Sequence, residues 1–332
     1  MRSEIVIAHL SDLHHPTIKE ETWARLKSYL VERKPDLILV TGDLTNHPWP
    51  WRHIQVRRKL LELVDECQKS RLTDAVAATG TQQPSGTDKQ RDVMLRVVPG
   101  NHDCAFWGNV GFYFLKWVSF DLVFRGYQQT FFDFSTDKLK LYFFSFNSNP
   151  FIARWAKGAV SRRQLKSFQR KMDELQESQP DSINDAYKVA LLHHHPMPIP
   201  YDEKLEKYLF LKNAGEFINA MAQNRINLVL HGHKHKPRIS SVSLGTTSTS
   251  RNVSIVASGS TLKDGEESTC NLITIYDNMR VEVKQAVANP GEDFIEKEVT
   301  TYLPSWDTYI EERYAAGKNK LGYEIESLSH TA

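Results

Sequence analysis

The chain has 332 residues, a formal net charge of +2, 40% hydrophobic residues and 25% charged residues. This composition is typical of a globular protein that buries one large core or two modest ones. The near-neutral charge gives little support to binding of nucleic acid or of an anionic membrane surface. The three cysteines are few and far apart, which favours reduced thiols and a cytoplasmic location over a disulfide framework. No signal segment precedes the first predicted strand, and no apolar run is long enough to predict a transmembrane helix.

Strand and helix signals alternate along the chain. Short apolar runs predict strands at residues 5–7, 37–40, 95–98, 189–192 and 228–230, and later strand-like runs lie at 253–256, 272–276 and 281–283. Apolar residues at helical spacing predict helices over about 17–33, 51–72, 161–177 and 205–224. Strands that alternate with helices indicate an α/β fold.

Side chains that bind metal ions follow each of the first five strands. The clusters are Asp12-Leu13-His14, Gly42-Asp43, Gly100-Asn101-His102-Asp103, His193-His194-His195-Pro196 and Gly232-His233-Lys234-His235. Carboxylate, imidazole and amide groups are donors that suit Mn, Fe, Zn, Co or Mg. Because ligand sites of α/β sheets lie at the carboxyl ends of the strands, we expect the clusters to meet there. The pattern indicates a two-metal hydrolase centre.

In order and context, these five clusters resemble the signature of the calcineurin-like metallophosphoesterase family over residues 4–235. A single Asp-x-His or Gly-Asp pair would be an ordinary loop or turn, so the resemblance depends on all five together. It implies a four-layer αββα sandwich of two mixed sheets with flanking helices. It also implies two divalent metal ions, of Mn, Fe, Zn or Co.

The resemblance assigns a role to each residue. It implies that one ion is bound by Asp12, His14 and His235, that the other is bound by Asn101, His194 and His233, and that Asp43 bridges them. His102 would then protonate the leaving oxygen, and Asp103 would hydrogen-bond His102. His193 is an alternative ligand in the triple histidine, while Asn46 and His195 are weaker candidates for substrate contacts.

The implied activity is metal-dependent hydrolysis of a phosphoester, with a metal-bridging hydroxide as the nucleophile. The run from Gly42 to Asn46 and the His-His-Pro run are similar to those of bacterial class III cyclic-nucleotide phosphodiesterases. They favour a phosphodiesterase for a small substrate, with cyclic nucleotides as candidates. The alternatives are a nuclease of the repair-exonuclease type, which needs a DNA-binding groove, and a phosphomonoesterase. A phosphoprotein phosphatase would require two phosphate-gripping arginines, and a non-catalytic scaffold is opposed by the complete ligand set.

We expect one catalytic domain over residues 1–290 and a C-terminal tail of helical character over 291–332. A polar stretch at 73–92 is predicted to be an exposed, mobile insertion. The aromatic segment within 104–135 is interpreted mainly as core, with a cap over the substrate pocket as the sharper alternative.

Overall fold

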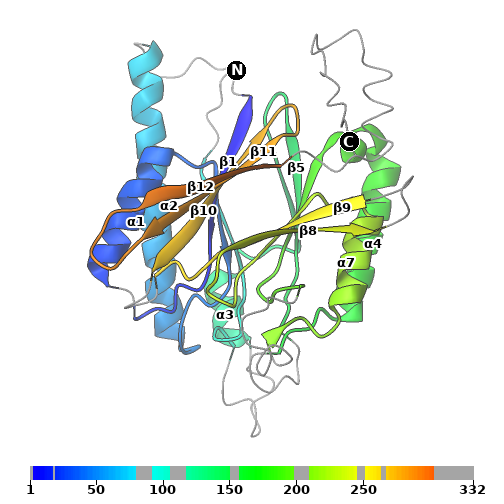
Figure 1. The fold of residues 1–332 in the computed structure, drawn as a ribbon, viewed down its shortest axis with the longest axis horizontal. Coiled ribbons are helices and arrows are strands. Elements are labelled where there is room, and N and C mark those ends of the chain that lie inside the picture. Colours follow the sequence, from blue (N-terminus) through cyan, green and yellow to red (C-terminus); the bar gives the residue numbers. More distant parts are fainter. Residues whose placement is uncertain are drawn as a thin grey trace, which may run out of the picture.

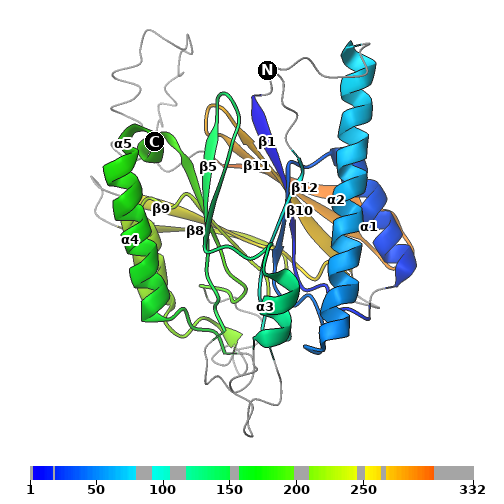
Figure 2. The same ribbon diagram turned by 180° about the vertical axis from the view of Figure 1, so that it is seen from behind.

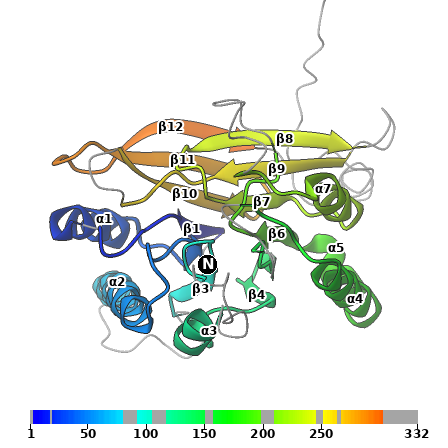
Figure 3. The same ribbon diagram turned by 90° about the horizontal axis from the view of Figure 1, so that it is seen from below.

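The computed structural model describes residues 3–17, 19–79, 92–104, 117–149, 157–197, 209–244, 251–262 and 267–302. Two six-stranded sheets pack face to face, and helices lie on their outer sides (Figures 1 and 3). Both sheets contain parallel and antiparallel pairs. The expected four-layer sandwich of two mixed sheets is therefore confirmed.

The first sheet has the strand order β12-β11-β10-β1-β2-β3. Its strands are β1 (Glu4–Leu10), β2 (Leu37–Thr41), β3 (Met94–Val98), β10 (Ser268–Tyr276), β11 (Val281–Ala288) and β12 (Ile295–Tyr302). The helices beside this sheet are α1 (Glu20–Arg33), α2 (Pro50–Thr79) and α3 (Val118–Phe124). The strands β1, β2 and β3 run parallel, so their carboxyl ends lie together.

The second sheet has the order β4-β5-β6-β7-β9-β8. Its strands are β4 (Phe131–Ser135), β5 (Lys140–Ser145), β6 (Tyr187–Leu191), β7 (Leu228–His231), β8 (Arg238–Leu244) and β9 (Arg251–Ala257). The helices beside it are α4 (Arg162–Ser178), α5 (Pro180–Asp185) and α7 (Ala214–Gln223). The central strands β5, β6, β7 and β9 are parallel.

Strand β1 shows how the layers are held. Ile5 and Ile7 belong to the core between the two sheets, whereas Ala8 and Leu10 belong to the core under α1 and α2. A strand that is buried on both faces is apolar at nearly every position, as this one is. Packing on both faces fixes the end of β1, and the loop that follows it carries Asp12 and His14.

Three elements differ from the expected boundaries. Helix α2 continues to Thr79, so residues 73–79 of the predicted insertion are helical, and residues 80–91 lie outside the described residues. Strand β12 pairs with β11, so the first sheet extends beyond the predicted domain boundary at residue 290. This strand was not predicted because several of its side chains are charged, whereas predicted strands are runs of apolar residues. Glu296 forms ion pairs with Arg33 and Lys284, and charged side chains are typical of an edge strand.

Helix α7 begins at Ala214 rather than near residue 205, because Leu211 instead forms a bridge with Gly158. Residues 198–208 lie outside the described residues, as does the predicted C-terminal tail after residue 302.

The described aromatic residues of the predicted cap belong to the fold itself. Phe120 and Phe124 on α3 are fully buried and pack with each other, with ring centroids 5.1 Å apart. Residues 131–135 form the edge strand β4. The interpretation as core therefore holds for this part of the segment, and residues 105–116 lie outside the described residues. No helix among the described residues has the length and apolarity needed to cross a membrane.

Candidate metal centre

The five predicted clusters meet at one end of the sandwich, where β1, β2, β3, β6 and β7 end. This is the end that lies away from the N-terminus, near α3 (Figure 2). The backbone N–H of Asp12 donates to the carbonyl of Gly42 at 3.0 Å, and that of His14 donates to the carbonyl of Asp43 at 2.9 Å. The loop after β7 joins them, because the N–H of His233 donates to Oδ2 of Asp12 at 2.9 Å. The site therefore spans both sheets.

The loops hold an unusual backbone conformation at the predicted ligands. Positive φ angles occur at Asp12 (54°), His14 (49°), Asp43 (50°), His233 (81°) and His235 (52°). Such angles cost about 1–2 kcal/mol for a residue with a Cβ, and they concentrate at functional sites. Asp12 and His14 converge because the chain turns sharply after β1 ends at Leu10.

Glycine is required where these loops touch. A Cβ atom on Gly100 would overlap the backbone nitrogen and carboxylate of Asp43, and one on Gly232 would overlap Ser11 and the carboxylate of Asp12. Gly42, at φ 94°, is pressed in the same way against the ring of His193. The glycines of three motifs therefore let backbone and ligand side chains approach closely.

One group of donor atoms comes from Asp12, His14 and His235, and these atoms lie within 4.8 Å of one another. The Nε2 atoms of the two histidines are 2.9 Å apart, and Nε2 of His235 lies 3.2 Å from Oδ1 of Asp12. That carboxylate oxygen is buried and has no hydrogen-bond donor. Two imidazoles and a carboxylate that face one point form a donor set suited to a divalent cation.

A second group centres on His193. Its Nε2 lies 3.1 Å from Oδ1 of Asn101, 3.1 Å from Nδ1 of His233 and 3.3 Å from Oδ2 of Asp43. Asp43 also forms a group with His14 and His102, and the donor atoms of these three residues lie within 4.8 Å of one another. The Asp43 carboxylate therefore lies between the two groups.

The triple histidine contributes His193 rather than His194 to this cluster. Nδ1 of His193 lies 2.7 Å from the carbonyl of Thr41, which can only accept, so Nδ1 carries a proton and Nε2 is the nitrogen that faces the other donor atoms. Nδ1 of His194 instead forms a hydrogen bond with Oγ of Ser148 at 2.8 Å, and its ring packs against that of His233 with 45° between the planes. The turn after β6 thus brings the ring of His193 to the other donor atoms, and we propose His193 in place of His194 as the ligand.

Two buried carboxylates dominate the charge balance. Burial alone would raise the pKa of Asp12, but His235 and His193 lower it to about 2. Burial would likewise raise the pKa of Asp43, but His193 holds it well below its usual value. Burial opposes the charged form of His193, yet the Asp43 carboxylate raises its pKa to about 9. Burial lowers the pKa of His233 to about 3 and also lowers that of His14, which keeps both imidazoles neutral and able to bind a metal ion.

His102 is held by a partner other than the expected one. Nδ1 of the His102 ring lies 3.2 Å from the backbone carbonyl of Asn46. The backbone N–H of His102 donates to Oδ1 of Asp43 at 2.8 Å. The fully buried Asp103 instead accepts hydrogen bonds from the backbone N–H groups of Leu44, Thr45 and Gly100. The hydrogen bond expected between Asp103 and His102 is therefore not the one that the structure shows. Asp103 joins the loops after β2 and β3, and the Asn46 carbonyl orients the His102 ring.

Asn46 and His195, the weaker candidates for substrate contacts, lie in different surroundings. Asn46 lies beside His102, as described above, and is partly exposed. His195 is fully buried, and its ring packs parallel to that of His233 with centroids 5.8 Å apart. His195 therefore packs under the site and does not form its surface.

Sequence reasoning missed Ser148, whose Oγ contacts the backbone nitrogen atoms of His193 and His194 as well as the His194 ring. No motif marks this serine, because its role depends on a contact between β5 and the loop after β6.

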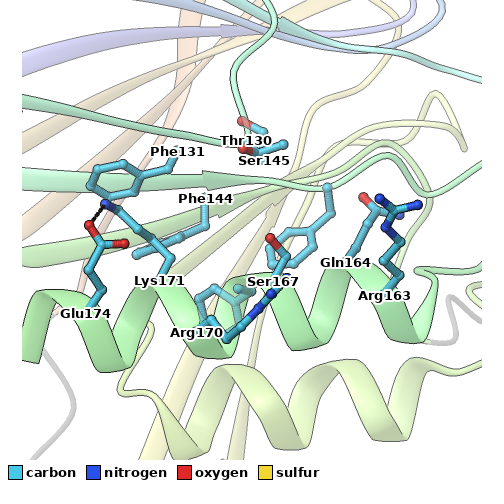
Figure 4. A pocket seen from close by; sticks show the side chains of 12 residues that line it. Thr130, Phe131, Phe144, Ser145, Arg163, Gln164, Ser167, Arg170, Lys171 and Glu174 are labelled. Atoms are coloured by element: carbon cyan, nitrogen blue, oxygen red, sulfur yellow. Dashed lines mark hydrogen bonds and ion pairs between the residues drawn. The ribbon is translucent and has the colours of Figure 1, made fainter.

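A surface groove lies elsewhere, between α4 and the strands β4 and β5 (Figure 4). Phenylalanines such as Phe131 and Phe168 line it, and Arg163, Arg170 and Lys171 lie along α4. None of the predicted site residues lines this groove. The metal centre is therefore a separate feature of the surface.

We predict that His193, and not His194, controls metal content. His193→Ala should lose at least half of the bound Mn, because it removes a donor from the second group. His194→Ala should retain most of its metal, since Nδ1 of His194 is hydrogen-bonded to Oγ of Ser148. Elemental analysis of protein reloaded with Mn measures both, with circular dichroism to check folding. Full metal content in His193→Ala alongside loss in His194→Ala would contradict this assignment.

We also predict a pH-dependent stability of the metal-free protein. Because the folded pKa of His193 is about 9 against 6.5 in the unfolded chain, its stabilisation is fully present below pH 6.5 and is lost as pH rises to 9. Chelator-treated protein should lose about 3 kcal/mol of unfolding free energy across this window. Urea unfolding measures this change, and His193→Asn is the control that should flatten the profile. A flat profile for the unsubstituted protein would contradict the ion pair.

The comparisons with known proteins agree with this geometry. The sequence profile of the family described as calcineurin-like phosphoesterase matches residues 5–237. Comparison with curated proteins finds no significant match. A solved structure of PhoD is similar in fold, with a TM-score of 0.56 and 11% identity over 92% of this chain and 70% of that one.

The purple acid phosphatase PPD1 from yellow lupin (Lupinus luteus) seeds gives a TM-score of 0.55 and 10% identity, over 91% of this chain and 54% of that one. This chain thus spans about half the length of that phosphatase, and at such identities the likeness concerns the fold alone. The family match covers most of the chain and includes every cluster of the site. The chain therefore belongs to the calcineurin-like phosphoesterase family.

Proposed function

We propose that this protein is a dinuclear metal-dependent phosphodiesterase for small phosphodiesters, with cyclic nucleotides among its candidate substrates. One observation carries the proposal: Asp43 lies between two groups of donor atoms. Its Oδ2 is 3.3 Å from Nε2 of His193 and 4.0 Å from Nε2 of His14. A carboxylate in this position is suited to bridge two cations.

The donor set fits two divalent ions. Asp12, His14 and His235 would hold one ion, Asn101, His193 and His233 would hold the other, and Asp43 would contact both. When bound, such ions supply Lewis acidity to phosphate oxygens and lower the pKa of the attacking water. Oxygen and imidazole donors of this kind accept Mn, Fe, Zn or Co.

His102 is suited to act on the leaving group. The Asn46 carbonyl accepts a hydrogen bond from Nδ1–H, so Nε2 is the nitrogen available to act on the substrate. The ring is partly exposed and lies edge-on to His14, with centroids 5.0 Å apart, so it borders the first donor group. A protonated His102 would donate to the departing alkoxide and balance its developing charge.

The position of Arg96 supports a diester over a monoester. A phosphate monoester is a dianion at neutral pH and profits from added cationic side chains, whereas a diester is a monoanion. Arg96, the arginine closest in sequence to the third cluster, lies over the ring of Phe132 and donates to the carbonyl of Leu95. This arginine is therefore occupied within the fold and does not serve as a phosphate clamp.

We predict metal-dependent cleavage of bis(p-nitrophenyl) phosphate at a rate at least tenfold above that of p-nitrophenyl phosphate, with metal-stripped protein resupplied with Mn. Asp43→Asn should lower activity by at least a hundredfold and reduce metal content. A fully active, metal-loaded Asp43→Asn protein would overturn the bridging role. Preference for the monoester would replace the diesterase assignment with a phosphatase.

We predict that His102→Ala slows esters with poor leaving groups about a hundredfold or more, and p-nitrophenyl esters much less, because p-nitrophenolate departs without protonation. The comparison of kcat for an alkyl and a p-nitrophenyl phosphodiester measures this difference. His47→Ala is the matched control, since His47 is an exposed histidine next to Asn46. Equal losses on both substrates would assign His102 to charge stabilisation alone.

A further inference from the structure

Two exposed tryptophans form a stacked pair where α2 begins. The rings of Trp49 and Trp51 lie 5.0 Å apart between centroids, with 9° between their planes. Trp49 is 48% exposed and Trp51 is 53% exposed. Each ring covers one face of the other, and about half of each residue remains exposed to solvent. Two aromatic rings exposed side by side form a contiguous apolar patch, and such patches mark candidate binding sites.

The pair follows directly from the loop that holds His102. Asn46, whose carbonyl accepts from His102, precedes Trp49 by three residues, so their Cα atoms are at most about 11 Å apart. The N–H of Trp49 donates to the carbonyl of His47 at 2.8 Å, which makes this connection a tight turn. The tryptophan pair is therefore joined to the loop beside His102 by one short turn.

The start of α2 is anchored to the loops of the metal centre by two histidines. The buried ring of His53 contacts Oγ of Ser119 at 2.6 Å and lies 3.5 Å from Oδ1 of Asp103. Gln55 bonds the ring of His15, the residue after His14, at 3.0 Å. These contacts fix the first turns of α2 relative to the metal ligands, so the tryptophan pair does not need to be ordered when a ligand binds.

We propose that Trp49 and Trp51 form a stacking platform for a planar aromatic substituent of the substrate, a nucleobase or an aryl group, while its phosphate lies at the metal centre. This inference rests on the proposed function and narrows its substrate class. Indole rings stack on the π-face of any base, so the platform would favour nucleotides and aryl esters over alkyl esters without selecting one base. The parallel geometry leaves an outer face on which a base extends the stack.

Binding of adenosine 5′-monophosphate and of ribose 5-phosphate to the Mn-loaded protein isolates the contribution of the base, because both ligands carry the same phosphate. Calorimetry should show adenosine monophosphate binding about tenfold tighter or more. The ratio of the affinity for adenosine monophosphate to that for ribose 5-phosphate should fall to near one in the double variant Trp49→Leu, Trp51→Leu. The double variant Trp49→Phe, Trp51→Phe should keep most of this ratio. Leu122→Ala is the matched control, since Leu122 is a 70% exposed apolar residue on α3.

The outcomes separate the two proposals. A ratio near one in the unsubstituted protein, or one that is unchanged in the leucine variant, would overturn the platform, while intact Mn-dependent diester hydrolysis would leave the proposed function standing. Absence of hydrolysis in the unsubstituted protein would overturn the proposed function instead. Loss of binding to anionic lipid vesicles in the leucine variant, with an unchanged ligand ratio, would identify the pair as a membrane contact. The phenylalanine variant keeps the test valid if the leucine variant fails to fold.

Discussion

The site depends on the burial of Asp43 beside His193. A carboxylate that is removed from water must be compensated by positive charge, and in the absence of metal the compensation comes from a protonated imidazole. A divalent cation that replaces the proton would supply more charge in the same place. The requirement for positive charge is therefore built into the protein, and it explains why neutral histidines converge on this point.

The rigidity of the sandwich makes this arrangement possible. The left-handed backbone at Asp12, His14, Asp43, His233 and His235 costs free energy, which must be offset by packing elsewhere. Strands such as β1 are buried on both faces, so the loops begin from fixed points. The close contact of Gly100 with Asp43 and the hydrogen bonds of Asp103 then join loops from adjacent strands into one unit.

The same loops connect the metal centre to its surroundings. Asp103 lies between the loops after β2 and β3 and also lies close to His53 of α2, so the start of this helix is held by the residues that shape the site. The turn from Asn46 to Trp49 continues this connection to the molecular surface. Proposed chemistry and proposed substrate selection thus share one structural support, and a change in either would affect the other.

The sequence by itself determined the fold class and the five loops of the site, because apolar strands and the donor residues after them are local patterns. It also predicted a helix from residue 161, where the side chain of Ser161 caps α4 through a hydrogen bond within one turn. It did not reveal β12, whose charged side chains are explained only by Arg33 and Lys284 of neighbouring elements. The tertiary structure alone decided which residue of the triple histidine faces the other donors, and that Asn46 rather than Asp103 orients His102. Both outcomes depend on carbonyl groups of distant strands and loops, those of Thr41 and Asn46, whose positions no local pattern of side chains encodes.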